Sequence, residues 1–194
     1  MAARKGRGGI ISINAPVILW LAFISFVILL VDYATGGMGM GLLASRFTSW
    51  LDPLMYIRLF TRTLVHANYE HFFGNFMLIL VVGPMMEEKY GSRNLCGMLL
   101  ITALVTGAVS LIFFRNVILI GASGLAFMLI LLASFANFNS GGLPLTVLLV
   151  GALYIGNEVA NGLLKVDNVS QSSHIVGGLC GSVFGFTHRD RARR

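Results

Sequence analysis

The chain has few charged residues. Asp, Glu, Lys and Arg make up 11% of its 194 residues, whereas roughly 25% is usual in soluble globular domains. Hydrophobic residues make up 56% of the chain, and its mean hydropathy is +0.82. This composition excludes an ordinary soluble domain and predicts an integral membrane protein embedded in a lipid bilayer.

Cysteine is also scarce. The two cysteines, Cys96 and Cys180, each lie inside an apolar run without a CxxC pair or a histidine at zinc spacing. We therefore expect neither a disulfide framework nor a metal site, and interpret both as small buried side chains. No linker rich in proline or serine divides the chain. We expect one domain over residues 15–187, between a basic N-terminus, 1–14, and a basic tail, 188–194.

Acidic residues are outnumbered, with 8 Asp and Glu against 14 Lys and Arg and a net charge of +6. The basic residues lie in loops and at the chain ends rather than along one helix with interleaved aromatic residues. That distribution argues against a nucleic-acid partner. We interpret the basic residues as signals of membrane topology.

Six apolar runs have membrane length, at roughly 15 to 22 residues each. They cover residues 15–31, 66–86, 95–114, 117–136, 143–164 and 173–187. The predicted fold is therefore all-α, a polytopic bundle of six transmembrane helices. Between the first two runs, residues 32–65 are aromatic and amphipathic, which predicts a first loop or helix lying in the membrane interface.

The first run is predicted to start with Asn14 as a helix cap and Pro16 in the first turn, where proline is tolerated. Basic residues before it also resemble a secretory signal, but no A-x-A cleavage site follows, so we predict an anchor helix. Six crossings place both termini on one side of the membrane. That side holds nine basic residues, Arg4, Lys5, Arg7, Lys89, Arg93, Arg189, Arg191, Arg193 and Arg194, and the other holds five, Arg46, Arg58, Arg62, Arg115 and Lys165. Nine against five predicts cytoplasmic termini.

Several polar residues lie inside the apolar runs, where a polar group is costly and indicates a functional site. A rise of about 1.5 Å per helical residue places them in the outer third of the membrane, in one layer open to water. They come from four of the predicted helices: His71, Asn75, Ser123, Asn157, Glu158 and His174.

Ser123 and His174 are the candidate nucleophile and base. A serine hydroxyl attacks an amide only when a base takes its proton, and a neutral imidazole within hydrogen-bond reach can do so. Gly121 and Gly124, on either side of Ser123, allow close approach of neighbouring backbone. His71 and Asn75 are four residues apart and share one helical face. With the backbone N–H of Ser123, their side chains could donate to a developing oxyanion.

Each signal alone also has a structural interpretation. A GxSG segment is common at helix contacts in membranes, and a single intramembrane histidine can make a structural hydrogen bond. Gly177, Gly181 and Gly185 recur every fourth residue, which predicts a close-packing face on the sixth helix. That face would let His174 approach Ser123. The conjunction of these residues at one depth favours the catalytic interpretation.

A family resemblance rests on motifs that occur in order from about Arg58 to Phe186. The motifs are Tyr56-Ile-Arg58, His66, His71-Phe-Phe-Gly-Asn75, Gly83 to Gly91 around Glu87, Gly121-Ala-Ser-Gly124 and Ser173-His-Ile-Val-Gly177. In these the chain resembles the rhomboid intramembrane serine proteases. The absence of an extra domain or seventh helix makes it similar to the minimal bacterial type, which implies a bacterial inner membrane.

The resemblance implies a Ser123/His174 dyad and an oxyanion hole made by the Ser123 N–H, His71 and Asn75. It implies transmembrane protein segments as substrates, and lateral entry gated by the fifth helix. It further suggests that Arg58, His66 and Glu87 hold the first loop and adjoining turns rather than contact substrate. These roles are expectations drawn from the family.

The chain departs from the family pattern at three places. Ile57 stands where the family usually has tryptophan, and Phe127 stands where many members have tyrosine. Phe127 can stack under an imidazole but cannot donate a hydrogen bond. Glu158 is unusual in an apolar helix. It is a candidate gate residue, either protonated, paired or facing the wet cavity.

Three other functions compete with the protease. A metalloprotease needs a ligand pair on one helical side, and the spacing from His66 through Glu70 to His71 does not provide it. A catalytically weak rhomboid-like protein that binds or escorts membrane clients is the main alternative. A transporter needs polar residues along its whole path, and only the outer third has them. The sequence predicts a dyad without a third acid and without a cofactor, and it carries no signal for the oligomeric state.

Overall fold

A computed structural model describes residues 14–136, 145, 149 and 168–188. The helices in these residues are α1 (Pro16–Thr35), α2 (Met38–Leu43), α3 (Pro53–Thr61), the 3-10 turn η1 (Arg62–Leu64), α4 (Tyr69–Tyr90), α5 (Ser92–Phe113), α6 (Ser123–Ala136) and α8 (Asn168–Thr187). Over this part of the chain the only strand-like pairing is an isolated bridge between Ser45 and Leu119. The described part of the chain is therefore all-α, as the lengths of the apolar runs predict.

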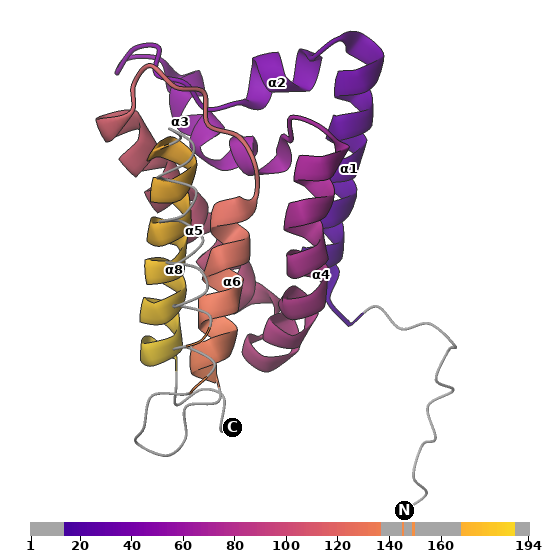
Figure 1. The fold of residues 1–194 in the computed structure, drawn as a ribbon, viewed down its shortest axis with the longest axis vertical. Helices are drawn as coiled ribbons and strands as arrows, with labels where there is room; N and C mark the ends of the chain where they lie inside the picture. The colour runs from indigo at the N-terminus through magenta and orange to yellow at the C-terminus, as the bar shows by residue number, and fades with distance from the viewer. Residues whose placement is uncertain (1–13, 137–144, 146–148, 150–167, 189–194) are drawn as a thin grey trace, which may run out of the picture.

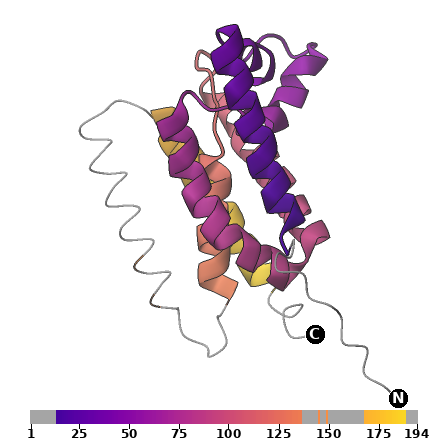
Figure 2. The same ribbon diagram turned by 90° about the vertical axis from the view of Figure 1, so that its right-hand side faces the viewer.

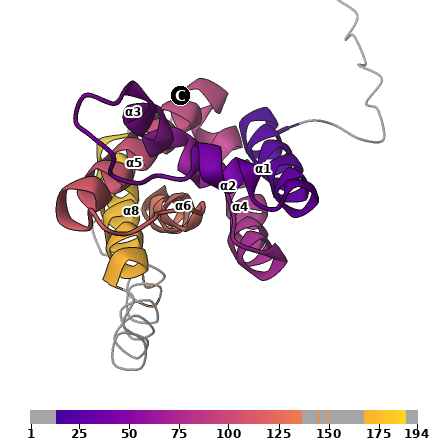
Figure 3. The same ribbon diagram turned by 90° about the horizontal axis from the view of Figure 1, so that it is seen from above.

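Helix α6 lies at the centre of the bundle. Seen from above, α5 and α8 lie on one side of it and α4 lies on the other (Figure 3). Residues on several sides of α6 are buried, as expected of a helix that is apolar all round; they are Gly124, Leu125, Ala126, Met128, Leu129, Leu132, Ser134 and Phe135. Helices α1 and α4 run side by side on one flank (Figure 2), and α8 lies against α6 on the other (Figure 1).

Three glycines of α8 let it pack closely on α6, two of them directly on its backbone. A Cβ atom at Gly177 would overlap the backbone oxygen of Gly124, and one at Gly181 would overlap that of Met128. A Cβ at Gly185 would overlap Phe135. These contacts advance together along both helices, so α6 and α8 are parallel, and the predicted close-packing face is confirmed.

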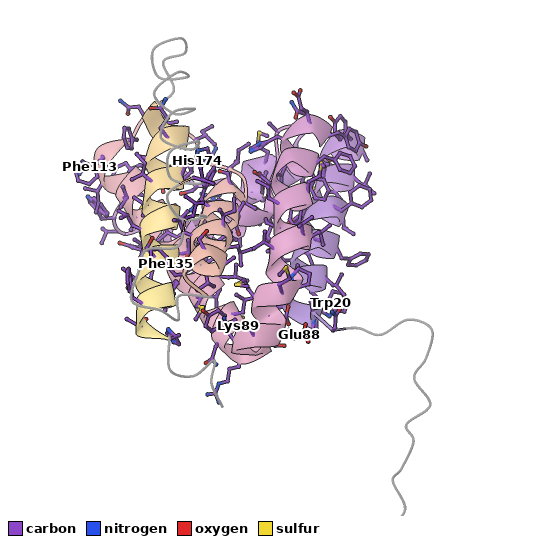
Figure 4. The ribbon with its side chains drawn as sticks, turned by 60° about the horizontal axis from the view of Figure 1, so that its bottom comes forward. Trp20, Glu88, Lys89, Phe113, Phe135 and His174 are labelled. Carbon is purple, nitrogen blue, oxygen red and sulfur yellow. The ribbon has the colours of Figure 1, made fainter. Side chains whose placement is uncertain are left out.

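The outward faces of the bundle are apolar. Large hydrophobic side chains are exposed along α1, α4, α5 and α8, including Trp20 at 61% and Phe113 at 72% exposure, both on the outer margin in Figure 4. By length and composition, α1 and α5 could each cross a membrane, and residues Ser123–Phe135 form a shorter apolar helix. An exposed apolar surface of this extent is typical of a protein surrounded by lipid.

Three of the predicted helices agree with the structure to within about four residues at each end. They are residues 15–31, 66–86 and 95–114, found as α1, α4 and α5. The run 143–164, with Asn157 and Glu158, lies outside the described residues apart from positions 145 and 149. Two clear apolar spans therefore support a polytopic bundle without testing all six.

Two predicted boundaries were wrong. Residues 117–122 were predicted as helix, but they form an extended connection before α6 begins at Ser123. The last helix begins at Asn168 rather than at 173, so His174 lies more than a turn inside it. Both boundaries were predicted from hydropathy alone. Residues 117–122 are apolar but not helical, whereas the polar residues Asn168 to Ser172 form the first turn of a helix.

The first turn of α1 is held by a residue from α4. Asn14 was predicted to cap this helix, but the N-cap residue is Ala15, and no side chain at the N-cap makes a capping hydrogen bond. Instead, the Val17 N–H donates to Oε1 of Glu87 and the Ile18 N–H donates to Oε2, both at 3.0 Å. Glu87 is 2% exposed. A carboxylate at a helix N-terminus satisfies free N–H groups and complements the helix dipole.

We expect Glu87→Ala to lower the free energy of unfolding by about 2–3 kcal/mol, because two backbone donors of α1 lose a charged acceptor. Glu88→Ala is the matched control, since Glu88 is the exposed neighbour at the same end of α4 (Figure 4). Unfolding of both variants in detergent, followed by circular dichroism, measures the difference. Equal stability of the two variants would show that Glu87 does not cap α1.

The first loop contains two short helices, α2 and α3, at one end of the bundle (Figure 1). Asp52 caps α3 by accepting the Leu54 N–H at 2.9 Å, and a hydrogen bond from Thr48 lowers the pKa of this carboxyl. Met55 and Leu59 face the core, while Leu54 and Ile57 are each 54% exposed. The exposed face of α3 is therefore apolar too, which suits a segment in contact with lipid.

Candidate active site

Ser123 is the first residue of α6. The connection from α5 descends from the end of the bundle into its interior before α6 begins (Figure 1). Ser123 itself is half-buried. The first N–H groups of a helix have no acceptor within the helix, so the backbone N–H of Ser123 is available to a ligand. The membrane depth predicted for Ser123 was counted along a helix starting at residue 117, but in the structure a non-helical segment precedes Ser123.

Backbone N–H groups ahead of Ser123 are bonded to the first loop and the turn that follows it. The Leu119 N–H donates to the Ser45 carbonyl at 2.9 Å, and the Gly121 N–H donates to the Arg62 carbonyl at 3.0 Å. The Ala122 N–H donates to Nε2 of His66 at 3.4 Å. The segment before Ser123 is therefore held in place by hydrogen bonds to Ser45, Arg62 and His66.

His71 and Asn75 lie together beside Gly121. Gly121 has a φ of +98°, a conformation that favours glycine. A Cβ atom here would lie 2.7 Å from Nε2 of His71 and 3.5 Å from Nδ2 of Asn75, so only glycine fits. Asn75 is buried, and within the described residues its Nδ2 has no hydrogen-bond partner. Two side-chain donor groups thus meet next to the backbone that leads into Ser123.

His174 lies on the other side of Ser123. Its ring packs on Phe127, with centroids 4.6 Å apart and an angle of 39° between planes. Phe127 is one turn after Ser123, so the two share a face of α6. Next to Ser123, a Cβ at Gly124 would lie 3.2 Å from the backbone oxygen of Ser173. In Figure 4, His174 lies on the inner side of α8. The contact between α6 and α8 therefore brings the helical turn that carries His174 close to the turn that carries Ser123.

His66 and Arg58 support the site from the first loop and the turn after it. His66 is 1% exposed and packs edge-on against His71, with ring centroids 5.1 Å apart. Arg58 donates from Nε to the carbonyl of Leu42 at 2.9 Å and so joins α3 to α2. Glu87 was grouped with these residues, but it caps α1 at the far end of α4. The expectation that Glu87 holds the first loop was wrong, because Glu87 lies in the last turn of the 22-residue helix α4, at the end opposite to His71.

Arg62 is a supporting residue that the sequence reasoning missed. It is 2% exposed and donates from Nη2 to the Ala103 carbonyl at 3.2 Å and to the hydroxyl of Thr106. Burial lowers the pKa of Arg62 to about 10, so the guanidinium stays charged at neutral pH. Arg62 was counted only as a topology signal. Its place four residues before His66 and four after Arg58 was the available clue, because such spacing puts polar groups on one face.

No metal centre is found in the part of the chain that the structure describes, where no three His, Cys, Asp or Glu side chains form a cluster able to hold an ion. The chemistry that these residues support is nucleophilic. A half-buried hydroxyl, an imidazole on the adjacent helix and donors beside a glycine turn are the components of acyl transfer.

Comparison with known proteins assigns the chain to a family. The family model of the rhomboid domain matches residues 53–191. The chain belongs to the rhomboid family. Its apolar helices and this membership make it a membrane protein. A relative is the "RHOMBOID-like protein 7" of Arabidopsis thaliana, 27% identical over 136 residues, which cover 66% of this chain and 42% of the relative. The match therefore spans less than half the length of that relative.

Two departures from the usual rhomboid pattern have clear consequences. Ile57 is exposed on α3 and does not anchor the first loop. Two hydrogen bonds hold the loop instead: Arg58 donates to the Leu42 carbonyl, and the Thr61 hydroxyl donates to the Leu43 carbonyl at 3.0 Å. Phe127 contacts the imidazole of His174 as predicted, but the two rings are tilted by 39° rather than stacked in parallel. Glu158, the candidate gate residue, lies outside the described residues.

Proposed function

We propose that this rhomboid is an intramembrane serine endopeptidase that cleaves transmembrane segments of membrane proteins near the outer face of the bilayer. The observation that carries the proposal is the convergence of four side chains around the first turn of α6. His71 and Asn75 lie beside Gly121 on one side of Ser123, and His174 packs on Phe127 on the other. Family membership supports the same activity.

In the proposed reaction, Ser123 Oγ attacks the scissile carbonyl carbon while His174 takes the hydroxyl proton. The carbonyl oxygen becomes an oxyanion, to which the Ser123 N–H and the side chains of His71 and Asn75 donate. Collapse of this intermediate breaks the C–N bond, and the imidazolium returns its proton to the leaving amine. Water then hydrolyses the acyl-enzyme by the same steps, with His174 again as the base.

The substrate helix must unwind before it can react. Helical hydrogen bonds occupy the backbone carbonyls, and lipid offers no replacement partners. We propose that unwinding occurs in the polar layer at the level of Ser123. We further propose that both termini face the cytoplasm, which the nine-to-five distribution of basic residues supports. A bacterial inner membrane remains a prediction from the sequence.

A fluorophosphonate probe tests the proposed nucleophile, because it reacts only with activated serines. We expect the purified full-length chain to be labelled, Ser123→Ala to give no labelling, and His174→Ala to give much less. Ser134→Ala is the matched control, since this hydroxyl lies on the same helix and donates to the Ile130 carbonyl at 2.9 Å.

Labelling of Ser123→Ala at the wild-type level would refute the assignment. A chain that is never labelled but retains a transmembrane client in detergent would instead support the alternative, a catalytically weak rhomboid-like protein that binds or escorts its clients.

A further inference from the structure

A buried arginine side chain joins the turn η1 to helix α5. Arg62 is 2% exposed, and its Nη2 donates to the Ala103 carbonyl at 3.2 Å and to the hydroxyl of Thr106. Its Nε lies against Gly107, where a Cβ would be 3.2 Å away, and has no hydrogen-bond partner in the described part of the chain. Burial of a charged group is costly unless it is hydrogen-bonded, so the guanidinium depends on the acceptors of α5.

The backbone of the same arginine holds the segment that leads into Ser123. The Arg62 carbonyl accepts the Gly121 N–H at 3.0 Å and the Val65 N–H at 3.2 Å. Gly121 lies two residues before Ser123, and a Cβ at this glycine would lie 2.7 Å from Nε2 of His71. A shift of the Arg62 carbonyl would therefore move the backbone that lies beside a proposed oxyanion donor.

Thr106, the acceptor on α5, lies next to the residue that follows Ser123. A Cβ at Gly124 would be 3.4 Å from Cγ2 of Thr106 and 3.8 Å from its Oγ1, which are ordinary contact distances. Thr106 is 1% exposed, and its hydroxyl donates to the Thr102 carbonyl at 2.6 Å while it accepts from Arg62. Arg62 and Thr106 therefore contact the backbone on both sides of Ser123.

We propose that the hydrogen bond between Arg62 and Thr106 positions Ser123 for attack, and that both are positioning residues of the active site. The bond fixes η1 against α5. It thereby keeps the Arg62 carbonyl at the Gly121 N–H and keeps Thr106 against Gly124, so the backbone of Ser123 is held from both sides. Without the bond, the buried guanidinium needs another acceptor, and η1 must move relative to α5. Both residues act through the backbone rather than on the substrate.

Hydrogen–deuterium exchange tests this link without requiring cleavage. Thr106→Val keeps nearly the same side-chain shape but removes the hydroxyl, whereas Thr106→Ser keeps the hydroxyl. Mass spectrometry of the peptide that covers residues 117–124, from the full-length chain in detergent, reports the amides of this segment. We expect Thr106→Val to raise the exchange rate of this peptide about tenfold, which is the scale of one lost hydrogen bond. We expect Thr106→Ser to restore most of the protection.

Thr102→Val is the matched control. Thr102 lies one turn earlier on α5, is fully buried, and also donates its hydroxyl to the carbonyl four residues before it, that of Met98, at 2.8 Å. Thr106 accepts from Arg62, whereas Thr102 has a side-chain contact with Cys180 of α8. We expect exchange in residues 117–124 to remain near the wild-type rate in Thr102→Val. Equal exchange in Thr102→Val and Thr106→Val would overturn the proposal.

The effect on chemistry rests on the proposed function. We expect Thr106→Val to slow fluorophosphonate labelling of Ser123 about tenfold, and to lower kcat by the same factor with little change in KM, because a small misplacement of the nucleophile slows the chemical step. If exchange rises in Thr106→Val but even the wild type is never labelled, the link stands and only the protease proposal fails. Labelling of Thr106→Val at the rate of an active wild type would refute the positioning role.

A second variant covers the case in which Thr106→Val does not fold. Arg62→Met keeps an apolar stem of similar length and removes the guanidinium. We expect this variant to fold, because it removes a costly buried charge, and to show the same faster exchange and slower labelling. The combined variant should add little, since both substitutions remove one shared bond. A folded Arg62→Met chain with wild-type exchange in residues 117–124, or effects that multiply in the combined variant, would overturn the proposal.

Discussion

We expect Ser123→Ala to slow cleavage of a transmembrane substrate by on the order of 10⁴-fold or more. The variant lacks the atom that forms the acyl-enzyme, while the surrounding backbone and the donors beside Gly121 are unchanged. Binding of the substrate should therefore be retained. Single-turnover cleavage in proteoliposomes measures the chemical step apart from substrate entry and product release.

The double variant gives a sharper result than either single one. When two residues act in the same step, the effects of replacing them are not additive, because the base has no role without the nucleophile and the nucleophile is not activated without the base. We expect Ser123→Ala, His174→Ala and the combined variant to show nearly the same residual rate. Losses that multiply in the double variant would mean that the two side chains act independently, and a Ser123→Ala rate close to wild type would place the nucleophile elsewhere.

The parts of this site that could be predicted are those encoded by local spacing. His71 and Asn75 share a face because they are four residues apart, and the structure places both at Gly121. The glycine repeat of α8 predicted close packing for the same kind of reason. Both predictions need only the periodicity of the α-helix and the sizes of the side chains, which can be read from the sequence.

The parts that could not be predicted depend on partners far away in the chain. Glu87 caps α1 from 69 and 70 residues away, and Asn14, the local candidate, does not. Residues 117–122 are as apolar as a helix, but their backbone pairs with Ser45, Arg62 and His66 instead. Tertiary hydrogen bonds of this kind override local propensity, and hydropathy does not report them.

The second large effect is expected at the contact between α6 and α8. We expect Gly181→Ala to lower the free energy of unfolding by about 3 kcal/mol, at the upper end of the usual range for overpacking. The added Cβ would overlap the Met128 backbone oxygen and lie 2.9 Å from its carbonyl carbon. Backbone atoms of a central helix cannot move aside as a side chain can, so the helices must separate.

Gly178→Ala is the control for this substitution. It lies on the same helix, gains the same helix propensity, and its Cβ would meet only Leu131 side-chain atoms at 3.7 Å. It should be neutral or slightly stabilising in the same unfolding measurement. If both variants lose equal stability, the contact with the Met128 backbone is not the cause of the loss.

Gly177→Ala then separates stability from chemistry. Its Cβ would overlap the backbone oxygen of Gly124, the residue after Ser123, so the separation it forces falls between nucleophile and base. We expect Gly177→Ala and Gly181→Ala to be destabilised alike, but only Gly177→Ala to lose most of its cleavage rate under conditions where both remain folded. Equal rates in the two variants would mean that the spacing of α6 and α8 at Gly124 does not control the approach of His174 to Ser123.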